Sequence, residues 1–393
     1  MTSRSDLERQ LTNVSNDSAR ALNLRTFSTN MNLNATKSDG FLGEFYKVSI
    51  TDSETHTTHD LVVKRAPTEN TRRQLNNAEW AYKNEIHFYT EIYPAFKKLE
   101  EEHCVQERFN SLPEFITCDK EVGREMIVLR DVTKMGFEMR RSDLLLDDEH
   151  ARLIFKTYGH FHAISFCLRE QVPEEFDRLA KPLYHIWKNF ANNDGFINLL
   201  TKLAENAYEG LDSARDAVVL EKLKKYLENT KEIFQDALAY DGKYLAILHG
   251  DCWSNNMMFK YQEQKSHSPA LVGMNLLDFQ LVATGTPVYD LSYFFYTGGS
   301  KELFDKLNDY LNIYYDSFSN SVRSLGNDPN EVFPREILNQ EWKRFSRFGM
   351  MLSMLLTKTK LISTVATNTQ STKSILQKRL CDIVIHMHEI DAL

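Results

Sequence analysis

The sequence has few cysteines, and their arrangement argues against two classes of cysteine-dependent protein. They number five, at positions 104, 118, 167, 252 and 381, and no two of them form a C-x-x-C pair. A disulfide framework normally shows an even set of cysteines, and a structural zinc site shows closely spaced pairs. We therefore expect reduced thiols and a cytoplasmic location.

The chain also lacks a long apolar run and an excess of basic residues. Its longest apolar stretch, residues 349–356, is far shorter than the roughly 20 residues that span a bilayer. The first residues are polar, without the apolar core of a signal peptide. The formal net charge is −8 and the pI is about 5.9, whereas nucleic-acid-binding domains normally carry a basic face. We expect no membrane or nucleic-acid partner, and the sequence leaves the oligomeric state unknown.

The apolar pattern predicts an α+β fold in two lobes, for which 393 residues are sufficient. The N-terminal part contains two alternating strands that form a hairpin, an apolar helical stripe over residues 76–101 and a short apolar strand at 126–129. The chain after residue 147 is mostly helical. We predict a small β-rich lobe with one long helix, residues 1–132, and a larger helical lobe, residues 133–393.

The most informative motif lies at residues 249–256, which read His-Gly-Asp-Cys-Trp-Ser-Asn-Asn. Asp278 follows Asn256 by 22 residues, within the run Leu-Leu-Asp-Phe-Gln. Together they form the H-x-D-x-x-x-x-N and D-F-x pattern of kinase-type phosphoryl transfer. A carboxylate can orient an acceptor hydroxyl and take its proton, and Mg²⁺ prefers carboxylate and amide oxygens. We therefore predict Asp251 as the catalytic residue and Asn256 and Asp278 as Mg²⁺ ligands.

Each of these residues also has a structural interpretation. Asp251 could cap a helix, Asn256 could occupy a turn, and Asp278 could cap a turn at a strand end. The run before Asp278 is apolar, and we expect it to form a buried hairpin at 257–259 and 272–277 with a polar tip at 261–269. A buried carboxylate needs a partner or a cation. This need, and the joint occurrence of the three residues, favours the catalytic interpretation.

Two residues upstream fit the same chemistry. Lys64 ends the apolar strand Leu-Val-Val-Lys, and Glu85 lies 21 residues later on the predicted helix. Kinases pair such a lysine with a helix glutamate, and the ammonium then contacts the ATP phosphates. The alternative is two unrelated surface charges. The segment from Ser38 to Gly43 reads S-x-G-x-x-G, so that Gly40 and Gly43 are candidates for a phosphate-covering loop. A plain hairpin turn would explain these glycines equally well.

Five other residues near these motifs have open roles. We expect His249 to orient the catalytic turn by hydrogen bonding, and His160 and His162 to have packing or capping roles on their helix. Trp253 could wall the acceptor site or fill core. Asp290 could brace the catalytic loop or be a solvated surface carboxylate.

The order of the motifs favours a small-molecule acceptor. Only 12 residues separate Asp278 from Asp290, and no Ala-Pro-Glu element follows, so that the long activation segment of protein kinases is missing. The chain resembles the ecdysteroid kinase-like family, also called CHK kinase-like, a relative of choline/ethanolamine kinases and aminoglycoside phosphotransferases. The matching stretches are residues 40–46, 61–65, 84–89, 129–132, 159–163, 249–256 and 277–280.

The resemblance implies a protein-kinase-like fold and an ATP-dependent phosphotransferase that acts on an alcohol group of a small molecule, for example an ecdysteroid, another steroid or a xenobiotic. It also implies that backbone groups of Arg130 and Val132 hold the adenine. Two departures stand out: Ser38 replaces the first loop glycine, and Arg130 stands where relatives often carry glutamate. Two alternatives remain open, a choline- or ethanolamine-type kinase, and a non-catalytic nucleotide- or hormone-binding protein.

Overall fold

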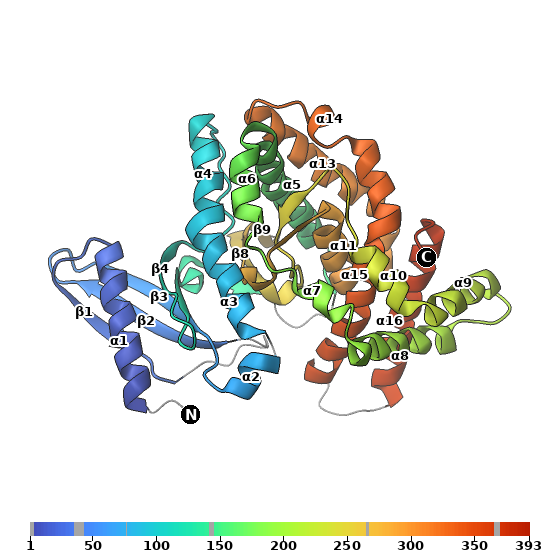
Figure 1. The fold of residues 1–393 in the computed structure, drawn as a ribbon, viewed down its shortest axis with the longest axis horizontal. Coiled ribbons are helices and arrows are strands. Elements are labelled where there is room, and N and C mark those ends of the chain that lie inside the picture. The colour runs from blue at the N-terminus through green and yellow to red at the C-terminus, as the bar shows by residue number, and fades with distance from the viewer. Residues whose placement is uncertain (1–3, 35–42, 76, 141–144, 265–266, 365–369) are drawn as a thin grey trace. The chain divides into compact units, whose positions relative to one another are not determined.

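The computed structural model describes the whole chain except residues 1–3, 35–42, 76, 141–144, 265–266 and 365–369 (Figure 1). It divides into two compact units that interleave along the chain. The first unit contains Met1–Ala95, Asn110–Arg140 and Asn255–Leu281; the second contains Phe96–Phe109, Arg141–Ser254 and Val282–Leu393. The lobe boundary that we placed at residue 132 stays a prediction.

The first unit is built on a five-stranded antiparallel sheet in the order β1-β2-β3-β5-β4. The expected hairpin is present as β2 and β3, and the apolar strand at 126–129 is β5. The sequence did not single out the two edge strands, β1 and β4. The bounds are β1 Phe27–Met31, β2 Glu44–Asp52, β3 Thr58–Arg65, β4 Phe115–Asp119 and β5 Met126–Arg130.

Helix α1, Arg4–Ala21, packs its apolar side against this sheet. Leu11 and Val14 join a cluster of buried strand residues that includes Val48, Leu61 and Val128. The burial of this apolar stripe explains why the segment is an ordered helix.

The long helix predicted at residues 76–101 is present as three consecutive pieces. These are α3, Ala78–His87, the π-helical turn η1, Phe88–Ile92, and α4, Tyr93–Glu102. A short helix, α2, Asn70–Leu75, precedes them. A π-turn inserts one extra residue into the helical repeat and so rotates the residues after it.

A second, three-stranded sheet of the first unit carries part of the predicted site. It has the order β6-β8-β9, with β6 Phe137–Met139, β8 Met257–Gln264 and β9 His267–Leu276. The predicted hairpin is confirmed, but its tip was placed wrongly: both strands continue well into 261–269. Polar strand residues there, such as Gln262 and Glu263, are exposed, and composition alone does not distinguish such a strand from a turn.

The second unit is mostly helical, with one short antiparallel pair, β7 Ala246–Leu248 and β10 Ala283–Gly285. Its helices are α5 Asp148–Gln171, α6 Pro173–Ala180, α7 Ile186–Phe190, α8 Asp194–Gly210, α9 Ala217–Glu228, α10 Thr230–Leu238, α11 Pro287–Gly298, α12 Lys301–Phe304, α13 Leu307–Ser324, α14 Pro329–Val332, α15 Arg335–Thr364 and α16 Gln370–Glu389.

Helix α11 is the centre of the second unit. Every one of its residues is buried, and it packs along α15, while α5 packs along α13. The expected α+β fold, with a small β-rich part and a larger helical part, is confirmed. Among the described helices, none has the length and apolar character needed to cross a membrane.

Candidate active site

Lys64, Glu85 and Asp278 form a buried ionic cluster in the first unit. The Nζ atom of Lys64 lies 2.6 Å from Oε2 of Glu85 and 2.8 Å from Oδ1 of Asp278. Lys64 is 3% exposed and Glu85 is fully buried. The interpretation of Lys64 and Glu85 as unrelated surface charges is therefore wrong, because a lysine at the end of β3 and a glutamate on α3 face each other.

The charges of this cluster are strongly coupled. Burial alone would lower the pKa of Lys64, but Asp278 and Glu85 hold it above its usual value, so that the ammonium stays charged. Burial, opposed by Lys64 and reinforced by Asp278, raises the pKa of Glu85 to about 7. The cluster thus contains one cation and two acidic groups that compete for it.

The residues that follow Asp278 fix its position. The ring of Phe279 stacks on Phe88, with centroids 3.6 Å apart and planes 4° from parallel. The side chain of Asn84 donates a hydrogen bond to the carbonyl oxygen of Gln280 at 3.2 Å. Asp278 itself has φ of +66°, a left-handed conformation that is uncommon outside glycine and costs of order 1 kcal/mol. Helix α3 and η1 therefore hold the segment in the strained turn that aims Asp278 at Lys64.

Asn256 and Asp278 come together because they flank the same end of the β8–β9 hairpin. Met257 pairs with Leu276, and the N–H of Leu277 donates to the carbonyl oxygen of Asn256 at 2.9 Å. Both side chains line one cavity of about 380 Å³. Because of this hairpin register, the carboxamide of Asn256 and the carboxylate of Asp278 line the same cavity, although the two residues lie 22 positions apart in sequence.

That cavity also contains the residues predicted to hold the nucleotide. Lys64, Glu85, Arg130 and Val132 line it, and all of its lining residues belong to the first unit. The Arg130 guanidinium lies 2.7 Å from a carboxylate oxygen of Glu114 and bonds His59 Nδ1 at 3.0 Å. Glu114 and His59 thus hold the guanidinium of Arg130 at this edge of the sheet.

Two backbone N–H groups of the 130–132 segment are already hydrogen-bonded to backbone carbonyls of the first unit. The N–H of Arg130 donates to Glu114 and the N–H of Asp131 donates to Asp60, each at 2.9 Å. The N–H groups of Arg130 and Asp131 are therefore not available to a base.

Of the two predicted loop glycines, only Gly43 is described. A Cβ atom there would lie 2.8 Å from the hydroxyl oxygen of Tyr82 and 3.4 Å from the carbonyl of Arg65. The close approach of Gly43, which directly precedes β2, to Tyr82 of α3 thus favours glycine independently of any phosphate. Gly40, like Ser38, lies outside the described residues, and the phosphate-covering role of both glycines stays a prediction.

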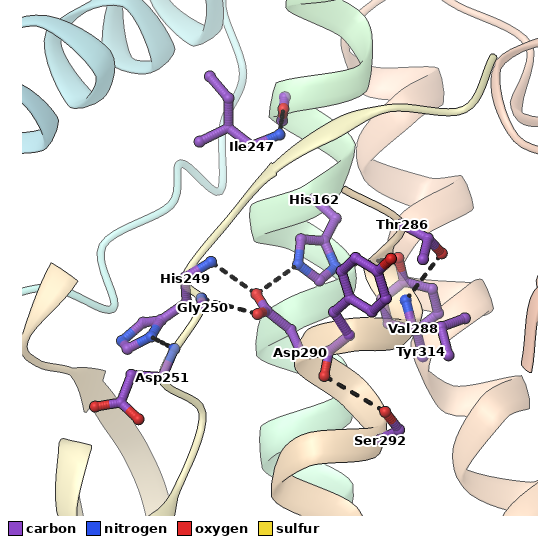
Figure 2. A network of polar contacts seen from close by, with 12 residues as sticks. His162, Ile247, His249, Gly250, Asp251, Thr286, Val288, Asp290, Ser292 and Tyr314 are labelled. Atoms are coloured by element: carbon purple, nitrogen blue, oxygen red, sulfur yellow. Dashed lines mark hydrogen bonds and ion pairs between the residues drawn. The ribbon is translucent and has the colours of Figure 1, made fainter. Parts of the chain in front are cut away.

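The turn that carries Asp251 lies in the second unit, after β7. Gly250 has φ of +82°, which glycine adopts without the cost that a side chain would add. The carboxylate of Asp290 accepts the N–H of His249 at 2.7 Å and the N–H of Gly250 at 2.9 Å (Figure 2). Asp290 is 1% exposed, so that the solvated-surface interpretation is wrong and the bracing one is confirmed.

A second layer holds Asp290. His162 on α5 lies with Nε2 3.2 Å from Oδ2 of Asp290, and its Nδ1 lies 3.2 Å from the hydroxyl of Tyr314 (Figure 2). Burial alone would raise the pKa of Asp290, but the hydrogen bond and charge of His162, with the backbone donors, keep it below its usual value. We expected a packing or capping role for His162; the ring is fully buried, as packing requires, but it also bonds Asp290.

Three contacts fix the Asp251 side of the turn. The N–H of Asp251 donates to Nδ1 of His249 at 3.2 Å, the orienting role expected for that histidine. The hydroxyl of Tyr293 donates to Oδ1 of Asp251 at 2.9 Å, and Nε1 of Trp187 donates to the carbonyl of Gly250 at 3.2 Å. Neither Tyr293 nor Trp187 was predicted from the sequence. Tyr293 could have been found, because it lies one helical turn after Asp290 and so on the same face of α11.

The structure therefore brings together Lys64, Glu85, Asn256, Asp278 and the 130–132 segment. Asp251 belongs to the other unit, and its convergence with these residues stays a prediction. The donors suit Mg²⁺: Asp278 and Asn256 offer hard oxygens on one cavity, and Mg²⁺ commonly takes one or two protein ligands with phosphate and water. Across the described residues, no cluster of three or more acidic, histidine or cysteine side chains forms an all-protein metal cage.

Comparison with known proteins adds the family to this geometry. Residues 37–327 match the ecdysteroid kinase-like family. The chain belongs to that family. The match covers every predicted site residue, from the loop glycines to Asp278, and makes the chain a kinase-like protein, as its motifs predicted.

The other comparisons are weak. Two solved structures of aminoglycoside 2′-phosphotransferase-IIIa, both GDP complexes, are similar to the chain. The wild-type enzyme is 14% identical over 95% of this chain and 98% of its own, with a TM-score of 0.39. A mutant of it is 15% identical over 97% of each chain, with a TM-score of 0.35. No curated protein matches the chain.

Proposed function

We propose that this member of the family is an ATP-dependent kinase that phosphorylates a hydroxyl group of a small-molecule alcohol. The observation that carries the proposal is the placement of Lys64, between Glu85 and Asp278, in a cavity that Asn256 and the 130–132 segment also line. These are the parts that phosphoryl transfer requires of the nucleotide-binding side.

In this proposal Lys64 binds the α- and β-phosphates. An ammonium has three N–H donors, of which two face Glu85 and Asp278. The third is available for a phosphate oxygen, and Glu85 keeps the ammonium in place. The carbonyl of Arg130 and the N–H of Val132 hold the edge of the adenine.

Asn256 and Asp278 would hold Mg²⁺. The ion, when bound, supplies charge neutralisation across the phosphate oxygens. The strained turn at Asp278 matters for this role, because it presents the carboxylate without any further rearrangement of the backbone.

Asp251 orients the acceptor hydroxyl and accepts its proton as the oxygen attacks the γ-phosphorus, while the bond from that phosphorus to the β,γ-bridging oxygen breaks and ADP leaves. Tyr293 fixes the rotation of this carboxylate by donating to Oδ1, and Asp290 fixes the backbone that carries it. Catalysis then comes from positioning and charge stabilisation, without a covalent enzyme intermediate.

The family description names ecdysteroids, and our proposal extends to other steroid and xenobiotic alcohols as acceptors. The test is a mass-shift screen in which purified protein and Mg-ATP are incubated with ecdysteroids, other sterols, plant phenolics and choline. A product heavier by one phosphoryl group identifies the acceptor. Phosphorylation of choline alone would instead favour a choline-type kinase.

The variant Asp251→Asn tests the role of the carboxylate. We expect turnover to be lost while ATP still raises the melting temperature, because the proposed nucleotide contacts do not include Asp251. Asp305→Asn, an exposed carboxylate of the same unit, is the matched control and keeps full turnover. Full activity in Asp251→Asn would refute the assignment. Stabilisation by ATP without transfer to any acceptor would indicate a non-catalytic binding protein.

A further inference from the structure

Arg379 on α16 is a buried cation with an incomplete set of partners. Its side chain is 7% exposed, and its Nη2 donates to the carbonyl of Tyr296 at 2.7 Å. Within the part of the chain that the structure describes, Nε and Nη1 have no hydrogen-bond partner, and no carboxylate lies within ion-pair distance. Burying a cation without a counter-charge costs several kcal/mol, so that such an arrangement calls for an explanation.

The guanidinium borders a cavity of about 260 Å³ in the second unit. Thr297, at the end of α11, and Thr357, on α15, line the same cavity. The hydroxyls of both are buried, and neither has a partner among the described residues. Polar groups from three helices therefore surround one space with their hydrogen bonds unmade, whereas buried polar groups are normally satisfied.

The carboxylates at the edge of the cavity do not neutralise Arg379. Asp382 lies 3.0 Å from Nζ of Lys378, and Glu302 is hydrogen-bonded to Ser300. Burial, only partly offset by these two carboxylates, lowers the pKa of Arg379 to about 10. The missing counter-charge is therefore not supplied by the residues lining the cavity.

We propose that this cavity is a binding site for a small amphipathic anion, whose carboxylate, sulfate or phosphate group pairs with Arg379. Nη1 carries N–H donors without a partner among the described residues, and an anionic oxygen can accept from it in a charge-assisted hydrogen bond. The threonine hydroxyls donate to the same group. The centre of the Phe304 ring lies 4.9 Å from Cζ of Arg379, so that this ring covers one face of the guanidinium.

The rest of the lining sets the size and character of the ligand. Leu145 and Ile375 contribute apolar surface, so that the body of the ligand is apolar. The volume is slightly below the roughly 300–1,000 Å³ of sites for drug-sized molecules, which indicates a ligand of a few carbon atoms beyond its anionic group. None of the residues that line this cavity belongs to the Asp251 turn or the Lys64 cavity. The site is thus independent of the proposed kinase function.

Binding of hexanoate to the full chain tests the site, with hexanol at the same concentration as the neutral control. We expect calorimetric titration to show hexanoate but not hexanol binding to the wild type. Arg379→Met should weaken hexanoate binding about tenfold or more, because charge-assisted hydrogen bonds are lost. Lys64→Met, which removes the cation of the other cavity, should bind hexanoate as the wild type does.

Thr357→Val keeps the shape of the site and removes one donor. We expect it to weaken hexanoate binding about threefold, the loss of a neutral hydrogen bond. If Arg379→Met does not fold, the hexanoate affinity of Thr357→Val tests the proposed site. Absence of binding to the wild type, equal binding of hexanol, or unchanged affinity in both Arg379→Met and Thr357→Val would overturn the proposal.

Discussion

Replacing Asp290 by asparagine tests the brace beneath the catalytic turn. Oδ1 accepts the N–H of Gly250, and Oδ2 accepts the N–H of His249 and faces His162. Asparagine has the same shape but only one oxygen, so that at least one buried N–H loses its acceptor. That loss costs about 1–3 kcal/mol, and the remaining bonds lose the assistance of a charge, about 1 kcal/mol more.

The expected destabilisation of about 2–4 kcal/mol is measurable by thermal unfolding. The entropy of unfolding is about 2.1 cal/mol/K per residue, or ~0.8 kcal/mol/K for 393 residues, so that the melting temperature falls by roughly 2–5 °C. Asp305→Asn is the control. It removes an exposed carboxylate 3.2 Å from Lys301, and we expect it to change stability by no more than about 0.5 kcal/mol.

The pH dependence of this difference has a defined sign. Because the pKa of Asp290 is lower in the folded chain than its usual 3.8, its contribution to stability is present above that value and is lost as pH falls below it. The gap between wild type and Asp290→Asn should therefore be constant at neutral pH and shrink in acid. Equal melting temperatures at pH 7, or a gap that widens below pH 4, would refute the bracing role.

Three further substitutions probe the two units. Lys64→Met removes the cation that lowers the pKa of Glu85, so that this pKa rises above its wild-type value of about 7. Because a raised carboxyl pKa favours the folded chain at low pH and this stability is lost as pH rises, the melting temperature should fall between pH 5 and pH 8 by several degrees more than in the wild type; an equal fall would contradict this. Gly43→Ala places a Cβ 2.8 Å from a buried hydroxyl of α3 and should cost about 1–3 kcal/mol in denaturant unfolding; an unchanged midpoint would show that the strand shifts freely. Tyr293→Phe removes the hydrogen bond to Asp251 and should lower kcat about tenfold with KM for ATP unchanged; a change in KM alone would contradict a role in orienting the carboxylate.

The sequence predicted the chemistry-bearing residues better than it predicted their supports. Lys64, Glu85, Asn256 and Asp278 were singled out because kinase-type transfer needs those groups at those spacings, and the structure places all four on one cavity. The stacking of Phe279 on Phe88 was not predictable in the same way. It joins positions nearly two hundred residues apart, and an aromatic residue after an aspartate has many structural uses.

The limits at the level of secondary structure have a similar cause. The central Ser-Thr-Asn residues of strand β1 are exposed and give no strand pattern of their own. The pairing of β1 with β2 explains why the segment is nevertheless a strand. Helix α1 carries an apolar stripe, but only the sheet beneath it makes burial of that stripe favourable. A local sequence pattern therefore predicted a helix or strand only where the residues of that segment carried a clear apolar periodicity.

The motif region contains three aspartates, and the surroundings of each carboxylate differ. Asp290 is enclosed by N–H donors, which keep it ionised and make it a fixed acceptor for the backbone. Asp278, 24% exposed, faces a lysine and an open cavity, so that it can exchange one cation for another. Asp251 is held by a phenol hydroxyl, which donates to its carboxylate without cancelling its charge. A neutral donor orients a base while an ionic partner would suppress it, and this difference supports our proposal that Asp251, rather than either neighbour, accepts the proton.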